Sequence, residues 1–135
     1  MAYTTIDDPE AYFQADAYTG SDPAISPTFD GDTNMQPDLI WIKSRESTHT
    51  HIIVDSVRGI SSSFEVSERT GEDASSEFIS AIGSDGFTTN NHDSVNNNGA
   101  GMITWCWKES ATAGFDIVSY TGNNTDDRDI SHSLS

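Results

Sequence analysis

The stretch Met102-Ile103-Thr104-Trp105-Cys106-Trp107 decides which fold this sequence can adopt. The run is too short for a buried helix, and β-branched and aromatic residues, which favour strands, make up much of it. Apolar side chains stand at neighbouring positions, so both faces of the strand have to be covered. We therefore predict a central, buried strand at 102–107, in an all-β domain.

Further short runs of this kind lie on both sides of that stretch, separated by turn residues. Asp38–Lys43 begins apolar on both faces, and His51–Val57 follows it after a polar turn, as a hairpin partner does. The other predicted strands are 12–18, 60–66, 78–82, 87–89 and 115–120. No segment has a sustained 3.6-residue apolar period, and Asn90–Gly101 is so rich in turn residues that it predicts a surface loop.

This pattern predicts an antiparallel β-sandwich or jelly roll with an extended N-terminal arm. All four prolines lie within residues 1–37, and proline rarely occupies a central strand. We place the arm at 1–16 and the β-sandwich module at 17–114. Residues 115–135 are predicted to be the last strand and the start of a candidate second repeat.

The candidate repeat rests on an internal similarity. Phe13-x4-Tyr18-Thr19-Gly20 recurs as Phe115-x4-Tyr120-Thr121-Gly122. Ile25-Ser26 recurs as Ile130-Ser131, with a three-residue difference in spacing. Two interpretations stay open: a repeated unit that continues along the protein, or chance similarity between two strand–turn segments.

Charge and cysteine content exclude several classes of protein. The chain has 135 residues with 22 acidic and 6 basic side chains, a formal net charge of −16, which phosphate backbones and anionic membranes repel. We therefore expect no nucleic-acid partner and no membrane insertion. A single cysteine cannot form an intrachain disulfide, and the first residues have no secretory signal pattern, so we expect folding in the cytoplasm.

Five motifs occur in an order that resembles a known family. They are Gln36–Lys43, Asp55-Ser56-Val57-Arg58-Gly59, Ser84-Asp85-Gly86-Phe87, Val95-Asn96-x2-Gly99 and Trp105-Cys106-Trp107-Lys108. The chain is similar over roughly residues 10–122 to the repeat domain of structural, tail-fibre-like proteins of marine and cyanobacterial phages. Those domains resemble concanavalin-like β-sandwiches. The resemblance implies a virion location and no enzymatic activity, and it carries over no catalytic or ligand-binding residue.

Residues 21–35 depart from the family pattern, which has a simpler passage like Ser131-His132-Ser133-Leu134.

No catalytic group stands out. Gly83-Ser84-Asp85-Gly86 does not have the spacing of a serine-nucleophile elbow and predicts a tight turn. A glycan hydrolase needs two carboxylates facing one cleft, and nothing in the sequence singles out such a pair among the acids. We therefore predict that the chain is not an enzyme and assign no catalytic and no cofactor-binding residue.

Two motifs have partial metal-ligand spacing. Asp30-x-Asp32-x-Asn34 fits the first positions of a calcium loop, but Met35 and Trp41 stand where such a loop needs Gly and Glu. A looser Ca²⁺ cage stays open as the alternative to an ordinary turn. His49-x-His51 supplies only two imidazoles, so we predict solvent-facing histidines and assign no metal-binding residue.

Other side chains are expected to serve packing. Arg58 should bridge to a carboxylate or to carbonyls within the fold. The three tryptophans should pack in the core, with a sugar-stacking platform as the alternative. The expected core includes Ile40, Ile42, Ile53, Phe64, Ile103, Trp105, Trp107 and Ile117.

The arm carries apolar side chains that we predict to anchor the chain to a virion, namely Tyr3, Ile6, Tyr12 and Phe13. A disordered free terminus is the alternative. The first expectation for function is a structural virion protein, a tail-fibre, appendage or head-decoration subunit. We expect it to bind other virion proteins and copies of itself, with a trimer favoured. A carbohydrate-binding module for a host glycan and a glycan depolymerase are the second and third.

Overall fold

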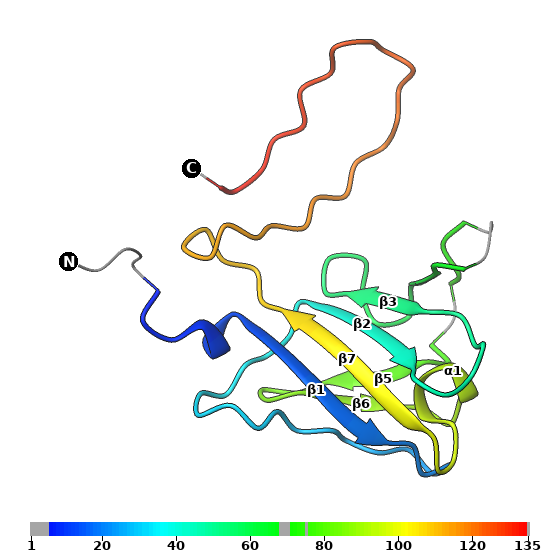
Figure 1. Cartoon of the computed structure of the whole chain (residues 1–135). Helices are drawn as coiled ribbons and strands as arrows, with labels where there is room; N and C mark the ends of the chain where they lie inside the picture. Colours follow the sequence, from blue (N-terminus) through cyan, green and yellow to red (C-terminus); the bar gives the residue numbers. More distant parts are fainter. Residues whose placement is uncertain (1–5, 68–70, 75, 135) are drawn as a thin grey trace.

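The computed structural model describes residues 6–67, 71–74 and 76–134, and it shows an all-β sandwich of antiparallel sheets (Figure 1). Its strands are β1 (Phe13–Thr19), β2 (Leu39–Ser44), β3 (Ile52–Asp55), β4 (Ser63–Glu65), β5 (Ile79–Ile82), β6 (Phe87–Thr89) and β7 (Gly101–Trp107). A 3-10 turn (Pro9–Ala11) precedes β1, and one short helix, α1 (Asp93–Asn96), precedes β7. The predicted fold class is confirmed.

The larger sheet has the strand order β1-β7-β2-β3-β4, and the smaller sheet is the hairpin β5-β6. β7 lies inside the larger sheet, where Trp107 pairs with Phe13 of β1 on one side and with Leu39 of β2 on the other. The prediction of a central strand at 102–107 is therefore confirmed. β2 and β3 pair as the predicted hairpin, with Ile40 opposite Val54.

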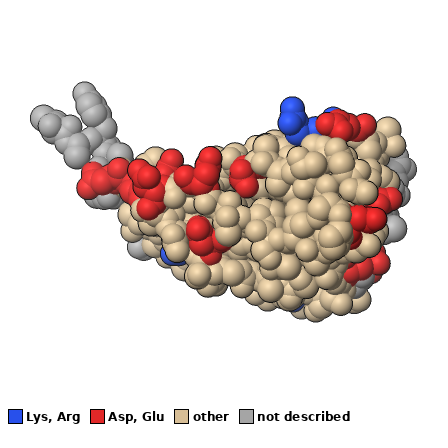
Figure 2. Space-filling view, turned by 90° about the horizontal axis from the view of Figure 1, so that it is seen from below, with Lys and Arg blue, Asp and Glu red and all other residues tan. Residues whose placement is uncertain are grey.

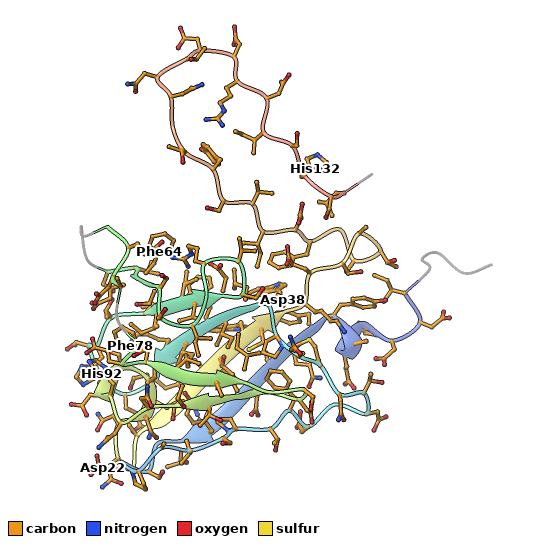
Figure 3. The ribbon with its side chains drawn as sticks, turned by 180° about the vertical axis from the view of Figure 1, so that it is seen from behind. Asp22, Asp38, Phe64, Phe78, His92 and His132 are labelled. Atoms are coloured by element: carbon orange, nitrogen blue, oxygen red, sulfur yellow. The ribbon has the colours of Figure 1, made fainter. Side chains whose placement is uncertain are left out.

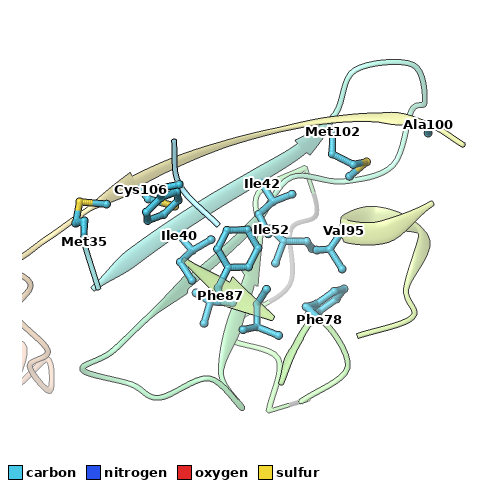
Figure 4. Packing of buried hydrophobic residues seen from close by; sticks show 13 residues of the cluster. Met35, Ile40, Ile42, Ile52, Phe78, Phe87, Val95, Ala100, Met102 and Cys106 are labelled. Carbon is cyan, nitrogen blue, oxygen red and sulfur yellow. The ribbon is translucent and has the colours of Figure 1, made fainter. Parts of the chain in front are cut away.

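The core lies between the two sheets (Figure 4). Alternate residues of β2, β3 and β7 point to this side, and α1 and the β5-β6 hairpin cover them. Burying such aliphatic and aromatic side chains contributes about 1.5–3 kcal/mol each. The buried apolar residues are Phe29, Met35, Ile40, Ile42, Ile52, Val54, Phe78, Ile79, Phe87, Val95, Ala100, Met102 and Cys106.

The expected core was correct only in part. Ile40 and Ile42 are fully buried, as predicted. Most of the others point away from the hairpin, because successive residues of a strand face opposite sides of the sheet. Ile53, Ile103, Trp105, Trp107 and Ile117 are half-buried, and Phe64 is 42% exposed. The prediction that these side chains form the core is wrong.

The long connection from β1 to β2 closes the remaining side of the core. Phe29 and Met35 enter it from this segment. Asp85 and Gly86 of the turn between β5 and β6 hold the segment: Asp85 Oδ1 accepts the Met35 amide at 3.2 Å, and Gly86 donates to the Met35 carbonyl at 3.3 Å. A side chain at Gly86, which has φ +104°, would lie 2.2 Å from the Pro27 carbonyl. The Ser84–Phe87 motif is thus a turn, as predicted.

Three other expectations need correction. The predicted surface loop 90–101 contains α1, whose Ser94, Val95 and Asn96 are buried because they cap the core beside the hairpin. The predicted strand 60–66 is reduced to β4. The predicted strand 115–120 is not formed: Phe115 makes one isolated bridge to Ser110, and β1 already occupies the free edge of β7.

The N-terminal region also differs from expectation. β1 begins at Phe13 and ends at Thr19, so it crosses the predicted boundary between the arm (1–16) and the sandwich (17–114). In Figure 2, acidic side chains far outnumber basic ones on the face shown, and several lie along the N-terminal stretch. Within the described ranges, no helix has the length and apolar character needed to cross a membrane.

The Cys106 thiol provides a test of this packing. Burial raises its pKa to about 12, and the side chain is fully buried in β7. At about pH 8 we expect a maleimide reagent to leave the native thiol unmodified, because the reactive thiolate is scarce and inaccessible. Labelling followed by mass spectrometry should show full modification only in denaturant. Rapid labelling of the native chain would contradict the position of β7.

Candidate functional site

The Asp-Ser-Val-Arg-Gly motif forms the turn after β3. Asp55, which is 4% exposed, accepts the Arg58 amide on Oδ1 at 2.8 Å and the Arg58 Nε on Oδ2 at 2.6 Å. Arg58 Nη2 lies 2.6 Å from the same Oδ2. Gly59 completes the turn with φ +89° and donates to the Asp55 carbonyl at 3.0 Å. The predicted bridge from Arg58 to a carboxylate within the fold is confirmed.

A hollow of about 360 Å³ lies beside this turn. The Arg58 guanidinium covers one side of it, 3.8 Å from the centre of the Phe64 ring and 3.5 Å from Glu72 Oε2. Residues 117–120 close the opposite side. Because Asp55, Glu72 and the Phe64 ring already contact the guanidinium, its charge is used within the fold.

The Val95-Asn96 motif fastens the end of β1. Tyr18 donates its hydroxyl to the Val95 carbonyl at 2.6 Å. The Asn96 side chain accepts the Ser21 amide at 3.0 Å and donates to the Pro23 carbonyl at 2.8 Å. These residues therefore hold the chain as it leaves β1, and the motif has a structural role.

The histidines do not meet each other. His51 Nδ1 accepts the Trp41 indole N–H at 3.1 Å, and burial lowers the pKa of His51. His49 Nε2 lies 4.0 Å from Asp93 Oδ2. Near the Asp30–Asn34 stretch, the backbone amide of Asp32 donates to Glu10 at 2.9 Å. Within residues 6–67, 71–74 and 76–134, no three His, Cys, Asp or Glu side chains are grouped so that they could hold a metal ion.

The side of the large sheet that faces away from the core is the largest feature left unexplained by the fold. Strand register aligns a continuous apolar row across all five strands: Ala15, Trp105, Trp41, Ile53 and Phe64. Two flanking rows add Phe13, Trp107, Leu39, Ala17 and Ile103. We call these ten residues the outer face. Each of them is half-buried or exposed.

The rings of the outer face pack against each other at steep angles. Trp41 and Trp105 lie 5.6 Å apart with planes inclined by 56°, and Phe13 and Trp107 lie 5.1 Å apart at 52°. Phe115 stacks on Trp107 at 6.2 Å and 28°. Figure 3 shows Phe64 on the side of the molecule nearest the C-terminal segment and Phe78 in the opposite layer. An apolar face of this kind gains free energy when another apolar surface covers it.

The predicted anchoring residues do not form one site. Tyr3 lies outside the described residues. Ile6 is half-buried, and the carbonyl of Tyr12 accepts the Lys108 amide at 2.9 Å. Phe13, 40% exposed, belongs to the outer face. Sequence reasoning missed the outer face itself, although the adjacent apolar residues in Leu39–Ile42 and Met102–Trp107 had indicated strands that are apolar on both sides.

The turn at Asp55 can be tested by substitution. Asp55→Ala removes the carboxylate that pairs with Arg58 and the acceptor of the turn, so we expect the free energy of unfolding to fall by about 3 kcal/mol. Urea unfolding followed by tryptophan fluorescence measures the change. Asp30→Ala, at an exposed aspartate, is the control and should shift stability by less than about 0.5 kcal/mol. Equal effects would mean that the buried ion pair does not stabilise the fold.

Comparison with known proteins gives one match. Among curated proteins none matches this chain, and none of the solved structures does. Residues 8–135 match the profile of the family described as Domain of unknown function (DUF7483). This match covers β1 to β7 and the C-terminal segment, so the chain belongs to the DUF7483 family.

Proposed function

We propose that this chain is a non-enzymatic structural module of a bacteriophage virion, and that it assembles by packing its outer face against another copy. The resemblance of its five ordered motifs to phage structural repeats suggests the setting. The observation that carries the proposal is the apolar row that crosses all five strands, from Ala15 to Phe64.

Charge supports this choice of surface. A chain with net charge −16 repels its own copies, so contact between copies needs a surface with few acidic groups. Of the positions that the register places on this side of the sheet, Asp55 is the acidic one, and Arg58 pairs with it. Lys43 lies on the same side, and its ammonium group donates to the Ser47 carbonyl at 2.8 Å. Burial of this face therefore brings few unpaired charges together.

Ring geometry distinguishes this proposal from glycan binding through the outer face. A flat polysaccharide stacks best on rings that share a plane, whereas Trp41 and Trp105 are inclined by 56°. Inclined rings present ridges and grooves, which interlock with side chains of another protein.

Glycan binding elsewhere is the second candidate. Tyr120 is 62% exposed and lines a hollow of about 300 Å³ with Asn123 and Asn124. An aromatic ring beside side-chain amides is a combination that can stack on a sugar and hydrogen-bond to its hydroxyls. Binding on a glycan array that is lost on Tyr120→Ala would favour this candidate.

The assembly proposal predicts the effect of a charge on the outer face. Ala15→Glu puts a carboxylate opposite Trp105, and we expect self-association to weaken at least about tenfold. Sedimentation velocity over a range of protein concentrations measures this, at physiological and at raised salt so that the net charge is screened. Ala24→Glu adds the same charge at an exposed site outside the strands and should associate like the parent chain.

Particle composition tests the setting. Mass spectrometry of purified phage particles should detect the parent chain, and particles assembled with the Ala15→Glu variant should contain less of it. A parent chain that stays monomeric at every concentration and is missing from the particles would overturn the proposal.

A further inference from the structure

Residues 115–134 are similar in sequence to β1 and to the segment that follows it, and the structure shows what each of the shared residues does in the first copy. Phe115, Tyr120 and Gly122 correspond to Phe13, Tyr18 and Gly20. The correspondence continues with Ile130 and Ser131 for Ile25 and Ser26, and with Leu134 for Phe29. The second copy therefore has an apolar residue, Leu134, at the position equivalent to Phe29, which enters the core after β1.

In the first copy, the fold requires Tyr18 and Gly20. The Tyr18 hydroxyl donates to the Val95 carbonyl at 2.6 Å, and its ring meets the edge of Phe87 at 6.2 Å. Gly20 donates to the Ala100 carbonyl and accepts the Gly99 amide. A side chain on Gly20 would lie 2.1 Å from the Asn97 carbonyl oxygen, so any other residue would displace the chain.

In residues 115–134, by contrast, the surroundings require neither Tyr120 nor Gly122. Tyr120 is 62% exposed. A side chain on Gly122 would meet no atom within 4 Å. The chain thus carries, at 120 and 122, the same two residues that the end of β1 needs. Here the Tyr120 ring lies 5.5 Å from the Arg128 guanidinium and makes no contact like that of Tyr18 within the described residues.

The segment after the strand repeats the pattern. Ile25 exchanges hydrogen bonds with Thr89, Ser26 lies 2.9 Å from the Thr88 hydroxyl, and Phe29 is 6% exposed in the core. Ile130 and Leu134 are only half-buried where they stand. A side chain equivalent to Phe29 would be buried much more fully in a complete module.

The intervening residues suit the position of β1 only in part, because Asp116 would replace Gln14, which is 6% exposed and donates to two carbonyls. Asp16 points toward the core side of the sheet, and burial raises the pKa of its carboxyl. Val118 stands at the equivalent position and would carry no desolvation cost there. Phe115 already stacks on Trp107, the ring that Phe13 also contacts.

We propose that residues 115–134 are a docking segment whose partner is the β7 edge of a second copy of this module, where they displace that copy's β1 and take its position. In that position Phe115 pairs with Trp107 and Tyr120 with Met102, Tyr120 donates to the Val95 carbonyl, and Gly122 lies against the Asn97 carbonyl. The partner uses a sheet edge and not the outer face, so this inference does not rest on the proposed function. Modules joined this way form a series in which each C-terminal segment completes the next sheet.

Every copy of the chain has the same β7 edge, and Gly20 is the residue that fixes the end of β1 beside it. Substitution of Gly20 therefore tests the proposal. In full-length Gly20→Val, β1 is displaced, and we expect residues 115–134 to replace it, from the same copy or from a neighbour. Gly122→Val should have the urea midpoint of the parent chain. The double variant should lose the cooperative unfolding transition, a loss far greater than the sum of the two single effects. Size-exclusion chromatography tells whether the replacing segment comes from the same copy.

Two further measurements complete the test. Tyr120→Phe should be silent in the parent chain and should lower the urea midpoint in the Gly20→Val background. If Gly20→Val does not fold, a synthetic peptide of residues 113–134 should restore its folded circular-dichroism signal, and the same peptide with Gly122→Val should not. Additive effects of the two valines overturn the proposal, and so does an unfolded Gly20→Val chain that the peptide fails to restore.

Discussion

Hydrogen bonding of β7 on both of its edges is the constraint on which the rest of the structure depends. β1 pairs with one edge from Phe13 to Thr19, and β2 pairs with the other from Leu39 to Ser44. β1 and β7 come from the two ends of the strand-forming region and β2 lies between them in sequence, so this part of the sheet needs residues from 13 to 107. Buried polar residues at the ends of elements fix the strands, such as Asn96 at the end of α1 and Asp55 at the end of β3.

The same constraint leaves one face of the sheet only partly covered, by Phe115 on Trp107 and by residues 117–120 beside Phe64. Ile40 and Cys106 point into the core, whereas Trp41 and Trp105, their neighbours along the strands, face the other way. A hairpin of two short strands covers one side only. Half-buried aromatic rings gain free energy when another apolar surface covers them. We therefore expect a surface for another molecule at the outer face and not at the two hollows.

The sequence predicted the strands better than their partners. Adjacent apolar residues identified β2 and β7 correctly. The expected bridge from Arg58 to a carboxylate or to carbonyls within the fold is confirmed, with Asp55 as the partner. The choice of core face failed at Trp105 and Trp107, because a strand that is apolar on both sides does not indicate which side the second sheet covers. Nor does the strand pattern at 115–120 indicate that β1 holds the available edge.

The prediction of a strand at 115–120 failed for a physical reason. A strand-forming segment becomes a strand only when a backbone edge is free to pair with it, and pairing is decided by the whole sheet. β1 is held at its C-terminal end by the contacts of Tyr18 and Gly20. The segment with Tyr120 and Gly122 carries the same two residues, but β1 already pairs with the β7 edge. Because the two segments share these residues, we propose that either one can pair with the β7 edge, which would leave the other available to a second copy of the module.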